Sequence, residues 1–139
     1  MNSMFEPLRK YAQFSGRARR AEYWQFLLLV IGIEIVFMVL ISLAGGSMAP
    51  GAAVPQSGPA LVVTLVYLVV MLGLLVPSVA VSIRRLHDTN RSAWWLLLAL
   101  IPVLGALVLL VFYVLDGTPG PNRFGPDPKG RSDAAEVFA

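Results

Sequence analysis

Glu34 is the first residue whose type and place could support chemistry, because it is an acid near the middle of an apolar run from residue 24 to residue 44. Acids at the centre of a bilayer are rare and often serve as proton relays or ion sites. No lysine or arginine stands in this run, so we expect the carboxyl of Glu34 to be neutral. Two interpretations stay open: a proton or ion site, and a hydrogen bond to the carbonyl of Gly73, which Pro77 leaves without its helical partner.

A second group of reactive residue types lies in the polar stretch from residue 84 to residue 93, which contains His87, Asp88 and Ser92. These are the side-chain types of a nucleophilic triad, but neighbours in one short turn rarely align as nucleophile, base and orienting acid. Two tryptophans follow, as is typical of a membrane–water interface. We therefore expect an anchored loop, no catalytic residue and no enzyme. Within it, Arg84 is expected to face Asp88 four residues on, and Ser92 to cap the next helix.

Arginines are the remaining candidates for binding. Five lysines or arginines precede the first apolar run, and three more follow the second. Cations beside a membrane attract anionic headgroups, and arginine can hold a phosphate through two parallel hydrogen bonds. No nucleic-acid-binding fold accompanies them, so lipid is the expected partner. The residues expected to bind anionic lipid or a membrane-protein partner are Arg17, Arg19, Arg20, Arg84, Arg85, His87, Asp88 and Arg123.

The composition that surrounds these residues is that of a membrane protein. Hydrophobic residues make up 57% of the chain and charged residues 14%, whereas an average soluble domain has about 45–50% and about 25%. The absence of cysteine and the single histidine exclude disulfides, cysteine-ligated zinc, iron–sulfur clusters, thiol catalysis and a histidine metal cluster. No metal and no cofactor are therefore expected.

Three apolar runs supply the elements that must position the polar residues, and we expect them to form helices at about 24–44, 61–83 and 94–115. Each exceeds the roughly 20 residues that a helix needs to cross about 30 Å of hydrocarbon, and none alternates as a strand would. The sequence therefore predicts an all-α membrane protein with three transmembrane helices. Residues 1–128 would form one multi-pass domain, and 129–139 a flexible end to an irregular Gly/Pro-rich tail.

The N-terminal segment predicts a short amphipathic helix that lies on the membrane surface. Phe5, Leu8, Tyr11 and Phe14 recur at intervals of three residues between basic side chains. A helix with one apolar face and one basic face is suited to the headgroup region.

The distribution of cations predicts the orientation. Eight of them lie before the first run or between the second and third, so we expect a cytoplasmic N-terminus and an external loop at 45–60, which has no charge. If the third run spans fully, the tail is external. An alternative uses Pro102 and Gly105 for a re-entrant helix–turn–helix that returns the tail to the cytoplasm. We expect the full span, because non-helical backbone at membrane depth must be shielded.

Three ordered strings carry a family resemblance. They are Phe14-Ser-Gly-Arg-Ala-Arg-Arg-Ala-Glu-Tyr-Trp24, Arg84-Arg-Leu-His-Asp88 with Asn90-Arg-Ser-Ala-Trp-Trp95, and Gly117-Thr-Pro-Gly120 with Asn122-Arg-Phe-Gly125. Over residues 5–128 the chain resembles the bacterial inner-membrane family known as domain of unknown function 805. The resemblance implies a small multi-pass protein of the bacterial plasma membrane with no established activity. Glu34 lies outside the pattern.

The expected function is that of a non-enzymatic scaffold or accessory protein. Motifs rich in Arg, Trp and Gly fit recognition of anionic lipid, of another membrane protein or of a second copy better than they fit bond-breaking. The alternative is a small oligomeric transporter or channel that uses Glu34. It is second because three helices alone enclose little polar volume.

Overall fold

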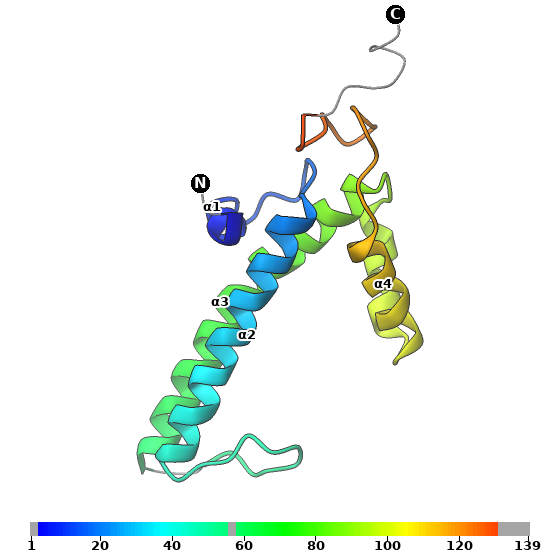
Figure 1. Cartoon of the computed structure of the whole chain (residues 1–139). Coiled ribbons are helices and arrows are strands. Elements are labelled where there is room, and N and C mark those ends of the chain that lie inside the picture. Colours follow the sequence, from blue (N-terminus) through cyan, green and yellow to red (C-terminus); the bar gives the residue numbers. More distant parts are fainter. Residues whose placement is uncertain (1–2, 56–57, 131–139) are drawn as a thin grey trace, which may run out of the picture. The chain divides into compact units, whose positions relative to one another are not determined.

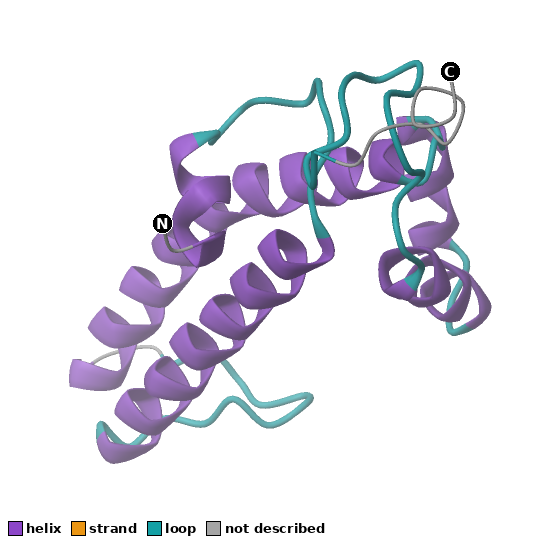
Figure 2. Cartoon of the chain, turned by 45° about the horizontal axis from the view of Figure 1, so that its top comes forward, coloured by secondary structure: helices purple, strands orange, loops and turns teal. Residues whose placement is uncertain are grey.

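The computed structural model describes residues 3–55 and 58–130, and within them every regular element is a helix (Figures 1 and 2). An isolated bridge between Asn122 and Gly125 adds no strand. The expected all-α class is confirmed. The elements in chain order are η1 (Ser3–Phe5), α1 (Glu6–Arg9), α2 (Arg20–Leu43), α3 (Gly58–Asp88), η2 (Ala93–Leu100) and α4 (Leu104–Val114).

Helices α2 and α3 are the two described elements that are long and apolar enough to cross a membrane. With 24 and 31 residues they are about 36 and 46 Å long at 1.5 Å per residue. Helix α3 contains the whole of the expected run 61–83, and α2 contains the expected run 24–44 except its last residue. Because α3 continues for five residues beyond the expected end at residue 83, it extends through Arg84 and Arg85 to Asp88.

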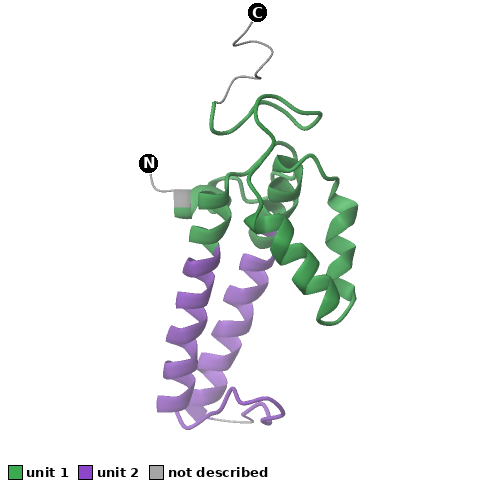
Figure 3. Ribbon diagram, turned by 45° about the vertical axis from the view of Figure 1, so that its right-hand side comes forward, with its two compact units in different colours: residues 1–26, 77–139 green, residues 27–76 purple. Residues whose placement is uncertain are grey.

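The chain divides into two compact units, which Figure 3 distinguishes. Unit 2 comprises residues 27–76, and there the rings of Phe37 and Tyr67 lie 5.5 Å apart between α2 and α3. Many large apolar side chains of unit 2 are exposed, as a lipid-facing surface requires; examples are Val36, Val69 and Leu72. Unit 1 comprises residues 1–26 and 77–139, of which 3–26 and 77–130 are described.

The core of unit 1 lies where the first turns of α2 and the last turns of α3 meet α4. Leu86, Leu109 and Tyr113 are buried together. The indole of Trp24 donates a hydrogen bond to the carbonyl of Tyr113 at 3.3 Å. Partly buried apolar side chains complete the core: Tyr23, Trp24, Leu96, Leu98 and Phe112.

The expected single helix at 94–115 is wrong. The third apolar run forms a hairpin in which η2 and α4 lie side by side, joined by a turn at residues 101–103 (Figures 1 and 3). Pro102 has no N–H to continue a helix, and Val103 has a positive φ of 61°. A Cβ added to Gly105 would lie 1.6 Å from the carbonyl oxygen of Leu98, so only glycine permits this approach of the two arms.

Hydrogen bonds within the turn supply part of the shielding that non-helical backbone needs at membrane depth. Within the turn, the amide of Ile101 bonds to Leu98 O at 3.0 Å, and that of Gly105 bonds to Ile101 O at 3.2 Å. The amide of Leu104 bonds to Pro102 O at 2.7 Å. The turn therefore satisfies these polar groups within itself, which is what a low-dielectric environment demands.

The two arms of the hairpin have the same length. Eight 3-10 residues in η2 rise about 16 Å at 2.0 Å per residue, and eleven α-helical residues in α4 rise about 16 Å at 1.5 Å per residue. This is about half of a 30 Å hydrocarbon core. The backbone thus has the form of the re-entrant alternative.

The N-terminal segment is helical over a shorter range than expected. Residues 3–9 form η1 and α1, whereas Tyr11 and Phe14 follow them in irregular chain. The two aromatic rings are nevertheless exposed, as are Phe5 and Leu8. An apolar surface is therefore present, and its contact with the membrane remains a prediction.

Candidate functional site

Asp88, the last residue of α3, is the centre of the most strongly bonded polar cluster in the described part of the chain. Its carboxylate accepts hydrogen bonds from Arg17 Nε at 3.0 Å and from Arg85 Nη1 at 2.5 Å. Its backbone carbonyl accepts one from the amide of Thr118 at 2.8 Å. Asp88 is only 1% exposed. One buried residue therefore ties the N-terminal segment and the tail to the end of α3.

Arg17 extends this cluster into the tail. Besides Asp88, its guanidinium donates to the carbonyl oxygen of Thr118 at 2.6 Å and to that of Gly120 at 2.7 Å. The side chain is 1% exposed. Since Arg17 precedes α2 and Gly120 follows α4, the N-terminal segment and residues 117–120 lie together. This contact favours an N-terminus and a tail on the same side of the membrane, and the side that each occupies remains a prediction.

Arg85 joins the same cluster to the end of α4. It donates to the carbonyl of Tyr113 at 3.2 Å and to that of Leu115. A weaker hydrogen bond, 3.4 Å long, reaches Ala18 O. Burial lowers the pKa of Arg85, and the charge and hydrogen bond of Asp88 oppose that shift. The carboxylate of Asp88 thus stabilises the buried positive charge of Arg85, which donates hydrogen bonds to several carbonyls.

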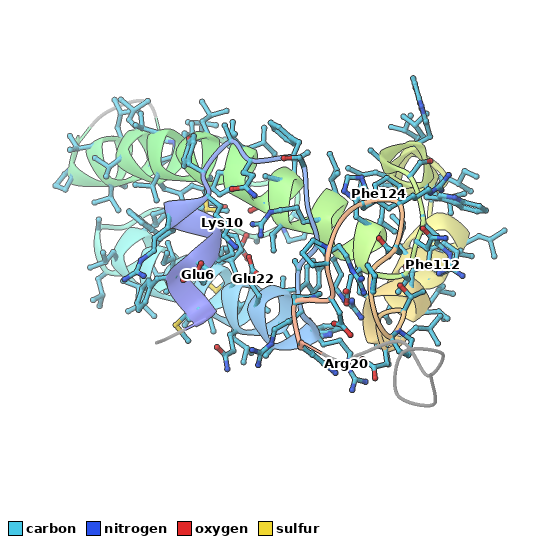
Figure 4. All side chains as sticks on the ribbon, turned by 90° about the horizontal axis from the view of Figure 1, so that it is seen from above. Glu6, Lys10, Arg20, Glu22, Phe112 and Phe124 are labelled. Atoms are coloured by element: carbon cyan, nitrogen blue, oxygen red, sulfur yellow. The ribbon has the colours of Figure 1, made fainter. Side chains whose placement is uncertain are left out.

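The expected pairing of Arg84 with Asp88 is wrong. Asp88 is occupied by Arg85 and by Arg17, whereas Arg84 Nη1 bonds to Glu22 Oε1 at 2.5 Å. Glu22 lies in the first turn of α2, and Figure 4 labels it together with the exposed Arg20, which is two residues earlier in the same helix. We call Arg17, Glu22, Arg84, Arg85 and Asp88 the ionic cluster; all five are buried.

His87 forms a second contact between α3, the N-terminal segment and the tail. Its Nδ1 lies 2.9 Å from the carbonyl oxygen of Gly16, and its ring stacks on Phe124 with the centroids 4.0 Å apart. Asn122 donates to the backbone carbonyl of His87 at 3.0 Å. Ser92 precedes η2 as expected, but its side chain forms no capping hydrogen bond. The ring of His87 is thus used to hold residues 16 and 124.

Three of the expected binding residues are exposed. Arg19 and Arg20 lie at the start of α2, and Arg20 Nε is 3.8 Å from Asp116 Oδ1. Arg123 lies in the tail, where it donates to Asn90 O at 3.1 Å. The expected set of eight is therefore divided between three exposed cations and five buried residues that join segments of unit 1.

The segments that meet in and around the ionic cluster are the three strings on which the family resemblance rests. The sequence profile of the family described as "Protein of unknown function (DUF805)" matches residues 11–126. The chain belongs to the DUF805 family.

Two curated relatives have been found in Escherichia coli strain K12. The inner membrane protein YhaH is 46% identical over 131 residues, which cover 93% of this chain and 98% of YhaH. The inner membrane protein YhaI is 42% identical over 126 residues, with 88% and 91% covered. No solved structure matches this DUF805 chain. The names of the relatives agree with the two membrane-length helices α2 and α3.

Glu34 does not join this site. It lies near the centre of α2 and belongs to unit 2, where it is half-buried. Among the described residues it forms no ion pair. Likewise, no group of three metal-ligating side chains occurs in the described ranges.

The tail supplies residues that sequence reasoning did not select for the site. A Cβ added to Gly117 would lie 2.1 Å from Asp88 Oδ2, so the carboxylate sits against the glycine backbone. Asp127 Oδ2 accepts the amide of Gly120 at 3.2 Å. Glu22 of α2 was not selected either. The strings that carry the family resemblance contain all of these residues except Asp127, but they do not show which partner each residue contacts. The residues that were not selected are Glu22, Gly117, Thr118, Gly120, Asn122 and Asp127.

Acidification is expected to destabilise unit 1 through His87. Burial lowers the pKa of His87, the hydrogen bond with Gly16 opposes this, and Arg123 lowers it further. The unfolded chain therefore binds the proton more readily, so the stability contributed is complete above about pH 6.5 and is lost as the pH falls below it. Thermal midpoints from about pH 5 to 8 should fall more steeply on acidification in the parent than in His87→Asn. Equal slopes would contradict this role.

Proposed function

We propose that this DUF805 protein is a non-enzymatic scaffold or accessory component of the inner membrane that binds anionic phospholipid headgroups. The observation that carries the proposal is the division of the arginines of unit 1. Arg17, Arg84 and Arg85 are buried and hold segments together. Arg19, Arg20 and Arg123 are exposed. The buried arginines are bonded to carboxylates and carbonyls within the fold. The exposed arginines are therefore the ones that can contact a lipid headgroup.

Membrane electrostatics supports a lipid as the ligand of these exposed cations. Each lysine or arginine near an anionic surface contributes about 1 kcal/mol, so three contribute about 3 kcal/mol. The orientation that we propose, with the N-terminus in the cytoplasm, brings them to the leaflet face that carries most of the negative surface potential. A membrane-protein partner, including a second copy of this chain, is the other candidate for the same face.

Replacement of the exposed arginines tests the proposal. The variant Arg19→Gln/Arg20→Gln/Arg123→Gln should retain at least tenfold less phosphatidylglycerol than the parent. The binding free energy of about 3 kcal/mol that the three arginines contribute corresponds to about a hundredfold in affinity. Native mass spectrometry of protein released from mild detergent measures the retained lipid. The matched Lys variant keeps the charge and should retain most of it. Equal retention by the parent and the Gln variant would refute the proposal.

A transporter or channel is the second candidate, and Glu34 is the observation that favours it. An acid near the centre of a membrane-length helix is a common feature of proton pathways. A proton flux into proteoliposomes that is lost in Glu34→Gln would favour this function over the scaffold.

A further inference from the structure

We propose that η2 is the seat of one diacyl phospholipid with an anionic headgroup. Its two acyl chains lie in two parallel furrows along η2, and its phosphate lies at Arg91. This inference deepens the proposed function, on which it rests, by naming where the lipid is held.

The furrows follow from the 3-10 geometry of η2. With three residues per turn, side chains at i and i+3 stand directly above one another, whereas those of an α-helix wind around the axis. Trp94, Leu97 and Leu100 therefore form one straight column, which we call the ridge. A run of eight residues is long for this helix type, which usually ends after three or four. The ridge is therefore straight because η2 keeps the 3-10 conformation over eight residues.

A hollow lies on each side of the ridge. Their volumes are about 330 and 350 Å³, and both are lined by Trp94 and Leu97. Trp94 is 78% exposed and Leu97 54%, so the ridge stands free between the two hollows. Every lining residue is apolar. The first hollow is completed by Trp95, Leu98 and Ile101, and the second by Ala93, Leu96 and Leu100.

The length of the furrows suits acyl chains. Eight residues of η2 rise about 16 Å, and the hydrocarbon of one leaflet is about 15 Å deep, half of 30 Å. A chain that starts beside Ala93 can therefore follow η2 to Ile101 without leaving its leaflet. Two straight furrows of this length match two chains joined at one glycerol.

The charges at the two ends of the furrows differ, and this selects the headgroup. The guanidinium carbon of Arg91 lies 4.1 Å from the ring centroid of Phe112. The ring of Phe112, a residue that Figure 4 labels, packs against Trp95, which lines the first furrow. The exposed Arg123 is bonded to the neighbouring Asn90. Within the described ranges, neither arginine pairs with a carboxylate. No charged residue follows until Asp116, so the far ends of the furrows are apolar.

Lowering the ridge tests the acyl-chain seat. The double variant Leu97→Ala/Leu100→Ala removes ridge side chains that are exposed, so the core of unit 1 is kept. Its control is Leu107→Ala/Leu110→Ala, two exposed leucines of α4 in the same hairpin. In detergent titrations with dioleoyl phosphatidylglycerol, followed by native mass spectrometry, the ridge variant should bind at least tenfold more weakly than the parent. The control should bind within twofold of the parent.

Two further arms test the headgroup and the number of chains. The parent should bind dioleoyl phosphatidylcholine several-fold more weakly than dioleoyl phosphatidylglycerol, and Arg91→Gln should reduce this difference between the two headgroups. Single-chain lysophosphatidylglycerol should bind the parent at least tenfold more weakly than the two-chain lipid. Equal binding of one-chain and two-chain lipids would overturn the paired furrows, and equal binding of the two headgroups would overturn the role of Arg91.

The outcomes separate this inference from the proposed function. If the ridge variant binds like the parent while Arg19→Gln/Arg20→Gln/Arg123→Gln loses lipid, the seat on η2 is overturned and the proposed function stands. If neither variant loses lipid, both are overturned. Loss in the ridge variant with none in its α4 control supports the seat.

Discussion

The variant Asp88→Asn is expected to destabilise the folded structure of unit 1. Two buried guanidinium groups, of Arg17 and Arg85, are bonded to the carboxylate that this change removes. Removing one partner of a buried ion pair costs about 3–5 kcal/mol, because the other charge stays buried without compensation. At about 2–4 °C per kcal/mol, the thermal midpoint in detergent should fall by about 10 °C. Residues 117–130 should become sensitive to protease.

Asp116→Asn is the matched control for this prediction. Asp116 lies in the same unit and pairs with Arg20 and Lys129, but its side chain is 46% exposed. Exposed ion pairs contribute about 0–1 kcal/mol, so its midpoint should change by no more than about 4 °C. If Asp88→Asn were as stable as Asp116→Asn, the ionic cluster could not be what holds the three motif segments together.

Hydropathy was sufficient to predict α2 and α3, but it could not separate a span from a hairpin. The run from residue 94 to residue 115 is as apolar as the other two, and its length alone indicates a span. Pro102 and Gly105 were the available signals of a turn. The close approach of Gly105 to Leu98 and the hydrogen bonds within the turn identify the hairpin, and these are tertiary features that hydropathy does not show.

The candidate site was predicted by residue type more accurately than by role. Charge and position selected Arg17, Arg85 and Asp88, but a local pattern shows neither burial nor a partner 71 residues away. Helical spacing suggested Arg84 with Asp88, and the structure pairs Arg84 with Glu22 of another helix. Some arginines that were expected to bind lipid, such as Arg17, instead form long-range hydrogen bonds with the tail, as Arg17 does with Thr118.

The second large effect expected is on the side of the membrane that the tail occupies. Arg17 holds residues 118 and 120 beside the N-terminal segment, and the hairpin returns the chain after about 16 Å in each direction. Residues 13 and 129 should therefore lie on one side, and the loop that contains residue 53 on the other. A third full span would instead separate 13 from 129.

Cysteine accessibility measures this most directly, because the chain has no cysteine of its own. Single variants Gln13→Cys, Ala53→Cys and Lys129→Cys place a thiol at positions that are exposed in the structure. In spheroplasts treated with a membrane-impermeant maleimide, we expect labelling at position 53 alone, and labelling at 13 and 129 only after permeabilisation. Labelling of position 129 but not 13 in intact spheroplasts would contradict the account, because the tail would then lie across the membrane from the arginine that is said to hold it.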